Sequence, residues 1–147
     1  MQQLDMQVIE HALQWINDGK SIWLCTVLAT FGSSPREPGS LLVAREDGIH
    51  AGSLSGGCVE EDFLARLRDG AFEGPVAVIR YGADDTSGPK VALPCGGILD
   101  VLVERLLPNE ANLQHLTMLH AALLGQRSLT RRVMLGDGRA CFVDRPA

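Results

Sequence analysis

Two of the four cysteines in this 147-residue chain stand beside glycine pairs: Cys58 follows Gly56-Gly57, and Cys95 precedes Gly96-Gly97. Glycine pairs let the backbone approach a ligand closely, because no Cβ blocks the way. A helix that begins near Cys58 would direct unpaired N–H groups and a positive dipole end at this point. Such a terminus binds anions and lowers the pKa of a thiol. We therefore predict that the fold brings the two Cys/Gly-Gly elements together.

Several chemistries are open to two such thiols. They could ligate a soft metal, form a redox pair or hold a sulfur-rich cofactor, whereas the alternative for each is a small buried core thiol. Ser55 extends the small-residue loop before the first thiol. Glu60 could accept a hydrogen bond, act as an acid or base, or complement the helix dipole.

A third candidate element lies in residues 31–39, where two prolines and two glycines predict a constrained loop. Ser33, Ser34 and Arg36 stand in this loop, and hydroxyls with a guanidinium suit a phosphate or a carboxylate. The alternative is that Arg36 only pairs with the neighbouring Glu37 or with solvent.

The remaining candidates are weaker. Cys25 lies inside an apolar run and is expected to be a core thiol, and His120 on an apolar helix face is expected to be a core histidine. Residues 136–141 approach the dinucleotide-binding fingerprint, but they lack its third glycine and do not open a helix. A hairpin turn is therefore favoured there.

Composition excludes several classes of protein. The formal net charge of −5 argues against a nucleic-acid platform, and no apolar run approaches the roughly 18 residues that span a bilayer. The polar start of the chain does not resemble a signal peptide, so we expect a cytoplasmic protein without a membrane partner. Four cysteines without a CxxC pair predict neither a disulfide scaffold nor a structural zinc site.

The hydrophobic periodicity predicts an α/β domain, with α+β as the variant. Its mixed and largely buried sheet would be flanked by about three helices. The apolar run 21–30 suits a strand buried on both faces. Helices are expected near residues 5–19, 59–68 and 109–124, and strands near residues 21–30, 41–44, 49–54, 76–81, 98–107, 128–135 and 139–143.

Three motifs, taken together and in order, resemble those of the XdhC/CoxI family. They are residues 30–39 (Thr-Phe-Gly-Ser-Ser-Pro-Arg-Glu-Pro-Gly), residues 52–60 (Gly-Ser-Leu-Ser-Gly-Gly-Cys-Val-Glu) and residues 95–97 (Cys-Gly-Gly). The resemblance implies an accessory protein that binds the molybdenum cofactor (molybdopterin). It would protect the cofactor while the terminal sulfido ligand is added, and deliver it to a molybdenum hydroxylase such as xanthine dehydrogenase.

On that resemblance Cys58 and Cys95 would face the molybdenum–dithiolene end as the metal-side residues. Ser33, Arg36 and the amides of residues 56–57 would hold the pterin or its phosphate. The apo-enzyme is the implied partner, with a cysteine desulfurase as a second candidate partner.

The chain departs from the family pattern in two ways. Longer members continue into a Rossmann-type domain, whereas residues 1–147 are expected to form a single XdhC/CoxI-like domain without one. Pro94 also precedes Cys95, where a small residue or glycine is expected, and it could alter how that thiol is presented.

Three functional hypotheses follow. The first is a cofactor-handling chaperone without turnover. The second is a thiol enzyme or redox protein that uses Cys58 and Cys95. The third is a module that docks on a partner enzyme through the helix near residues 109–124 or the strand with Arg131-Arg132. We also expect a homo-oligomer, with a site shared across a twofold axis as one arrangement.

The second hypothesis makes a direct prediction, because a helix start lowers the pKa of a thiol. Cys58 should react with iodoacetamide below about pH 8.5, the ordinary thiol pKa. Mass-spectrometric mapping of alkylation against pH measures this. A Cys58 that reacts only above that pH contradicts the redox hypothesis.

Overall fold

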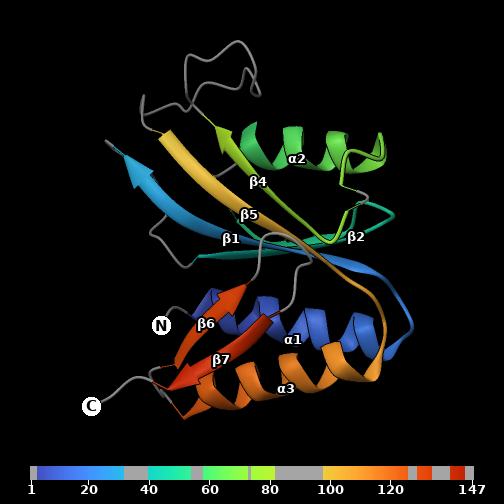
Figure 1. Ribbon diagram of the computed structural model, residues 1–147. Coiled ribbons are helices and arrows are strands. Elements are labelled where there is room, and N and C mark those ends of the chain that lie inside the picture. The colour runs from blue at the N-terminus through green and yellow to red at the C-terminus, as the bar shows by residue number, and fades with distance from the viewer. Residues whose placement is uncertain are drawn as a thin grey trace.

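The computed structural model describes residues 3–31, 40–53, 58–72, 74–81, 98–125, 129–133 and 140–144. Its main feature is a five-stranded sheet with the strand order β3-β2-β1-β5-β4. Helices cover both faces of this sheet, and a separate two-stranded sheet lies beside them (Figure 1). No helix in the described ranges is long and apolar enough to cross a membrane.

The sheet is built around two long central strands, β1 (Ile22–Phe31) and β5 (Ile98–Leu106). They pair in an antiparallel register from Ile22↔Leu106 to Phe31↔Ile98. β2 (Leu41–Arg45) and β3 (His50–Gly52) extend the sheet on one side, and β4 (Val76–Tyr81) forms the edge on the other. Every described pair of strands is antiparallel.

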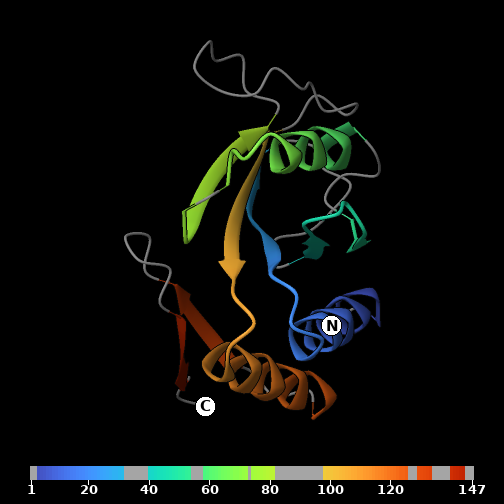
Figure 2. The ribbon, with the colours of Figure 1, turned by 90° about the vertical axis from the view of Figure 1, so that its right-hand side faces the viewer.

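One face of the sheet is covered by α2 (Cys58–Arg68). Val59, Phe63 and Leu67 recur at helical spacing on α2, and they pack on alternate residues of the strands such as Cys25 and Val101. Figure 2 shows this helix and the sheet as two layers. The burial of these side chains fixes α2 over the strands.

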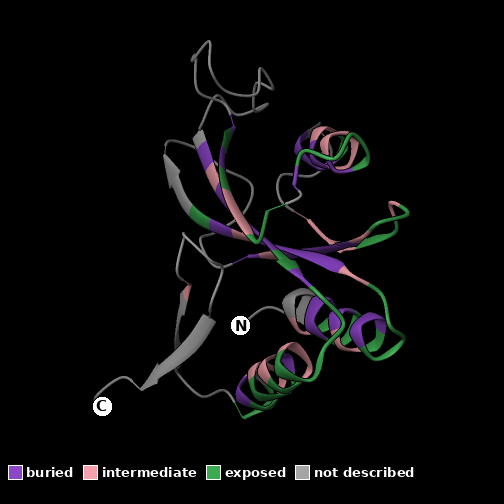
Figure 3. Cartoon of the chain, turned by 45° about the vertical axis from the view of Figure 1, so that its right-hand side comes forward, coloured by how far each residue is buried: buried purple, intermediate pink, exposed green. Residues whose placement is uncertain are grey.

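The opposite face is covered by α1 (Gln3–Asn17) and α3 (Glu110–Leu124). Val8, Ile9 and Ile16 of α1 pack with Ile22 and Leu24 of β1 in a second buried cluster. Figure 3 shows buried residues on both of these sides of the sheet. β1 is apolar at successive positions because both of its faces are covered, as the run 21–30 predicted.

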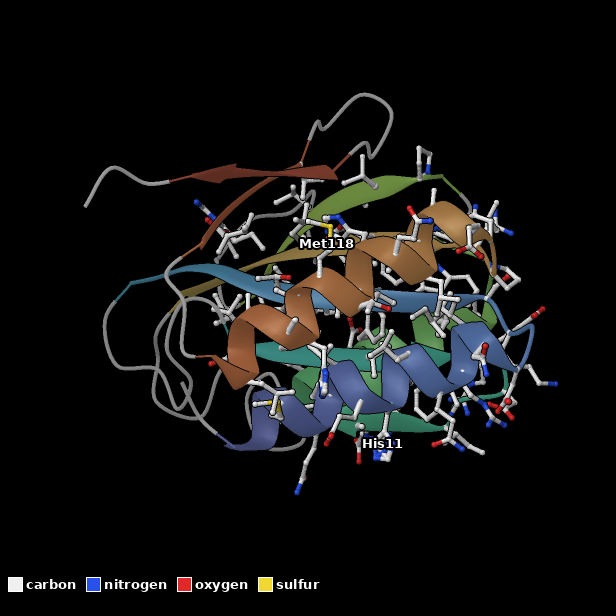
Figure 4. The ribbon with its side chains drawn as sticks, turned by 90° about the horizontal axis from the view of Figure 1, so that it is seen from below. His11 and Met118 are labelled. Atoms are coloured by element: carbon white, nitrogen blue, oxygen red, sulfur yellow. The ribbon has the colours of Figure 1, made fainter. Side chains whose placement is uncertain are left out.

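α3 contributes only part of its apolar surface to this second cluster. Its Leu116 is fully buried, whereas Met118 is 56% exposed and Leu124 is 63% exposed. Figure 4 shows Met118 on the side of α3 that points away from α1, and His11 on the side of α1 that points away from α3. The buried face of α3 therefore includes neither Met118 nor Leu124.

The second sheet is a hairpin of β6 (Leu129–Val133) and β7 (Ala140–Asp144), with Arg131 opposite Phe142 and Arg132 opposite Cys141. The motif-like residues 136–141 fall largely within the connection between the two strands. The hairpin predicted there is therefore confirmed, since β6 and β7 pair directly across it.

The sequence predicted the elements well and the strand directions less well. The helices and strands lie within a few residues of their predicted positions, and the α/β class in its α+β variant is confirmed. The expected mixture of strand directions is corrected to an antiparallel sheet. Periodicity reports which face of a strand is buried, but it does not report which neighbour the strand pairs with.

His120 is also less buried than predicted. Its side chain is 23% exposed, and its Nε2 lies 3.4 Å from the Glu10 carboxylate of α1. The histidine therefore joins the two helices at their surface instead of lying in the core.

Gly52 marks the point where β3 ends and the Cys58 motif begins. Its φ is +93°, a conformation that favours glycine. A Cβ at this position would lie 2.6 Å from Val8 Cγ2 and closer still to the Leu41 carbonyl oxygen. The close approach of α1 and β2 thus leaves no space for a side chain at the start of the motif.

We predict that Gly52→Ala lowers the free energy of unfolding by about 2 kcal/mol or more, because it adds a backbone clash to a strained φ. Urea denaturation followed by circular dichroism measures this. Gly74→Ala is the matched control: a Cβ at residue 74 would meet no atom within 4 Å, and its φ is not positive, so stability should hardly change. Equal effects of the two substitutions would contradict the packing argument.

Candidate functional site

The register of the central strands places the ends of two predicted site segments side by side. β1 ends at Phe31, where the segment 32–39 begins, and Phe31 lies opposite Ile98 of β5. The segment 82–97 runs between Tyr81 and Ile98, and Tyr81 lies opposite Leu99. Neighbouring strands in a sheet are about 5 Å apart. Both segments therefore leave the sheet at the same end of three adjacent strands.

The helix that begins at Cys58 starts at this end as well. Asp62, one turn into α2, lies close enough to Tyr81 at the end of β4 to affect its pKa. Figure 1 shows α2 running back along β4, with its first turn beside the end of that strand. The end of β1, the start of β5, the end of β4 and the first turn of α2 thus lie at one end of the sheet.

A bulge helps to direct the first of these segments. The pairing of β1 with β5 shifts register between Val27 and Ala29, and the intervening Leu28 is 45% exposed. A bulge adds a residue to one strand and bends it. The bulge thus changes the direction of β1 before its last residues, Ala29 to Phe31.

Most of the predicted site residues lie outside the described ranges. These are Ser33, Ser34, Arg36, Ser55, Gly56, Gly57, Cys95, Gly96 and Gly97. Cys58 is described as the first residue of α2, but its side chain is not. The direct proximity of the two thiols and their contact with a metal therefore stay predictions.

Glu60 is the predicted site residue whose side chain the structure describes. It is only 7% exposed, and its Oε1 accepts a hydrogen bond of 3.3 Å from Ser53 Oγ. Ser53 follows β3 directly, so this contact joins the end of the strand to the first turn of α2. The bond shows how Glu60 helps to hold both ends of the segment that contains Ser55, Gly56 and Gly57.

Tyr81 was not among the predicted site residues, although it stands at the last position of β4. Its side chain is fully buried, and within the described part of the chain its hydroxyl has no hydrogen-bond partner of acceptable geometry. Burial raises the pKa of Tyr81 well above its ordinary value, and the negative charge of Asp62 raises it further. The phenol is therefore held in its protonated form.

Asp62 itself is fixed by Arg66, whose Nε lies 2.8 Å from Asp62 Oδ2. The spacing of four residues on a helix allows this ion pair, and the sequence carries that signal. The proximity of Tyr81 to Asp62 could not be recognised from the sequence, because 19 positions separate the two residues along the chain.

Cys25 is the core thiol that the sequence predicted. It is fully buried on the face of the sheet under α2. Burial raises the pKa of this thiol well above its ordinary value, and the charge of Glu104 adds to the effect. A thiol held protonated in this way is a poor nucleophile and a poor metal ligand.

The described ranges contain no group of three or more His, Cys, Asp or Glu side chains that could hold a metal ion. The side chains of Cys58 and Cys95, which the sequence assigns to the metal, are not among those that the structure describes. The predicted metal residues thus remain a hypothesis about residues 58 and 95.

Comparison with known proteins identifies the region that contains two of the three motifs. Residues 15–82 match the model of the XdhC and CoxI family. The resemblance to the XdhC/CoxI family is confirmed. The match includes β1, α2 and β4, which are the elements that bring the motif ends together.

Two curated relatives agree with this result. The chain is 31% identical over 99 residues to the molybdenum cofactor insertion chaperone PaoD of Escherichia coli strain K12, which is 67% of this chain and 31% of that protein. It is 30% identical over 93 residues to a probable xanthine dehydrogenase subunit of Bacillus subtilis strain 168, which is 62% of this chain and 28% of that protein. The aligned region thus spans less than a third of each relative.

A solved structure shares the fold. A crystal structure described as a xanthine dehydrogenase from Bacillus halodurans superposes with a TM-score of 0.69 over 95% of this chain and 42% of that one. The identity is 23%, so this likeness supports the fold alone.

The raised pKa of Tyr81 gives a testable prediction, because this is the only tyrosine in the chain. The phenolate absorbance of the folded protein should not develop near pH 10, where an exposed tyrosine ionises. Since the folded pKa lies above the unfolded one, stability should be fully retained below about pH 10 and fall as the pH rises further. Ultraviolet titration of folded and urea-unfolded protein measures the difference.

Tyr81→Phe supplies the control for this titration. At neutral pH it should change the free energy of unfolding by less than about 1 kcal/mol, since the described residues give the buried hydroxyl that it removes no good hydrogen-bond partner. At about pH 11 the variant should be more stable than the wild type. A wild-type phenol that titrates normally in the folded state would show that the side chain is accessible.

Proposed function

We propose that this chain binds the molybdenum cofactor and holds it for delivery to a molybdenum hydroxylase of the xanthine dehydrogenase type. The observation that carries the proposal is that the segments 32–39 and 82–97 leave the same end of the sheet, where α2 also begins. The identity of the ligand rests on the E. coli relative, whose name states molybdenum cofactor insertion.

The chemistry of the residues at this end suits such a ligand. α2 begins at Cys58 and is 11 residues long, so its first N–H groups and its dipole favour an anionic group there. The cofactor is anionic and coordinates its metal through sulfur, and thiols are ligands that such a soft site accepts. Arg36, Ser33 and the amides of residues 56–57 are proposed to hold the pterin or its phosphate by charge-assisted hydrogen bonds.

The hydrogen bond between Ser53 and Glu60 is proposed to help position the start of α2 relative to the end of β3. It joins Ser53, which precedes the segment 54–57, to Glu60 in the first turn of α2, and so limits how far apart the two flanks of that segment can lie. Cys25 takes no part, because its thiol is buried and protonated. These features describe a holding site, and the proposed protein is accordingly a chaperone without turnover of its own.

When bound, the cofactor supplies the molybdenum and its terminal sulfido ligand for the recipient enzyme. The chain's own contribution is to bind the cofactor, exclude solvent from it and release it to a partner. The recipient is proposed to be a molybdenum hydroxylase because both the E. coli and the B. subtilis relatives have names that refer to such enzymes or their cofactor.

The test is retention of cofactor by the purified chain. After anaerobic incubation with molybdenum cofactor, the wild type should carry molybdenum through gel filtration, as measured by mass spectrometry of the metal. The Cys58→Ala/Cys95→Ala double variant should retain roughly tenfold less, because it loses the proposed thiol ligands. Circular dichroism of each variant checks that the fold is intact.

Cys141→Ala is the matched control, because it removes a cysteine from β7 without changing any of the three motifs. It should retain cofactor as well as the wild type does. Equal retention by the wild type and the double variant would remove the thiol assignment, and no retention by the folded wild type would overturn the proposed function.

A further inference from the structure

The two edges of the five-stranded sheet differ in length and composition. β3, at one edge, has three residues and ends at Gly52, so it offers little backbone to another strand. β4, at the other edge, has six residues and contains neither glycine nor proline. Its register with β5 is continuous from Val76 to Tyr81, so no bulge interrupts it. Three features that protect edge strands, short length, proline and a bulge, are thus absent from β4.

The backbone of β4 presents hydrogen-bonding groups to this edge. The Arg105 N–H of β5 donates a hydrogen bond of 3.0 Å to the carbonyl oxygen of Pro75, directly before β4. Residues of an antiparallel pair alternate between bonding to the neighbouring strand and facing away from it. Ala77 therefore bonds to β5, whereas Val76 and Val78 direct their N–H and C=O groups outward. None of the described strands pairs with this outer side of β4.

The side chains along this edge are apolar or already paired. Val78 is 49% exposed, and Val76 is half-buried. Arg80 is the one charged residue of β4, and its Nε lies 2.7 Å from Oδ1 of Asp100 on the neighbouring β5. Because this charge has a partner within the same sheet, it does not repel an approaching strand.

The helices leave the approach to this edge open. Figure 2 shows the first residues of β4 at the side of the sheet, clear of α1, α2 and α3. The hairpin of β6 and β7 lies below them, beside α3, and forms a sheet of its own. A further strand can therefore align with β4 without displacing a described helix.

We propose that β4 pairs with β4 of a second copy of this chain, antiparallel and about a twofold axis at Val78. In this register Val78 lies opposite Val78 of the other copy, and each Arg80 lies opposite Val76. Because Val78 directs both of its backbone groups outward, the two valines exchange their N–H and C=O hydrogen bonds. One sheet then runs through both copies.

An identical strand suits this edge for two reasons. The central row across the two copies reads Leu102, Val78, Val78, Leu102, so each exposed valine is covered by its own counterpart. The register also keeps the two Arg80 side chains apart, whereas like charges placed directly opposite each other would destabilise the pair. A twofold contact needs a surface that is complementary to itself, and this strand provides one.

The two copies keep separate cofactor sites in this arrangement. β4 ends with Tyr81 at the candidate site, and the paired strands run in opposite directions. The two candidate sites therefore lie at opposite ends of the joined sheet, which differs from a site shared across a twofold axis. The pairing does not rest on the proposed function, so self-association and cofactor retention can fail independently.

Sedimentation velocity of the purified chain over a range of concentrations tests the pairing. The wild type should form a dimer in the high-micromolar range. Val78→Lys should raise the dissociation constant at least roughly tenfold, because it places two like charges directly opposite each other. Leu124→Lys is the matched control: it makes the same change in charge at a residue of α3 that is 63% exposed, and it should leave the dimer unchanged.

Disulfide crosslinking tests the register. In the proposed pair the two Cα atoms of residue 78 are about 5.5 Å apart, which a disulfide can span. Val78→Cys should therefore form a covalent dimer under mild oxidation. Val76→Cys should not, because its counterpart lies four residues away along the strand, or about 13 Å. The wild type measures the background from the four native cysteines.

Three results would overturn the proposal. The wild type sediments as a monomer at all concentrations, Val78→Lys and Leu124→Lys have the same effect on the dimer, or Val76→Cys crosslinks as well as Val78→Cys. Thermal denaturation of each variant shows that a lost dimer does not come from unfolding.

Discussion

The antiparallel pairing of β1 with β5 is the interaction on which the rest of this structure depends. It joins nine residues of β1 to β5 and lies at the centre of the five-stranded sheet. One face of this pair carries α2 and the other carries α1, so both apolar clusters are built on it. Because Phe31 lies opposite Ile98, the same pairing also brings two motif segments to one end of the sheet.

Each end of this sheet has its own chemistry. At the end where β1 and β4 finish, the described residues include the start of α2, the buried Tyr81 and the Glu60 carboxylate that accepts a hydrogen bond from Ser53. At the other end, Trp23, Arg68 and Arg105 line one cleft. The sheet between them is apolar and covered by helices on both faces.

Two buried ionisable groups have different consequences for the site. Cys25 is held protonated in the core and is thereby excluded from the thiol chemistry that the sequence allowed for any cysteine. Tyr81 is also held protonated, but it stands where the segment with Cys95 leaves the sheet. Burial thus excludes Cys25 as a reactive thiol. It also keeps the phenol of Tyr81, which belongs to no sequence motif, protonated at the end of β4.

The sequence by itself determined the elements, the core role of Cys25 and the family, because periodicity, local composition and ordered motifs are properties of neighbouring residues. The tertiary structure alone decided the antiparallel pairing, the exposure of Leu124 and the position of Tyr81 beside Asp62. It also decided the gathering of Trp23, Arg68 and Arg105 around one cleft. These features join residues that are distant along the chain, and only the register of the strands and the packing of the helices bring such residues together.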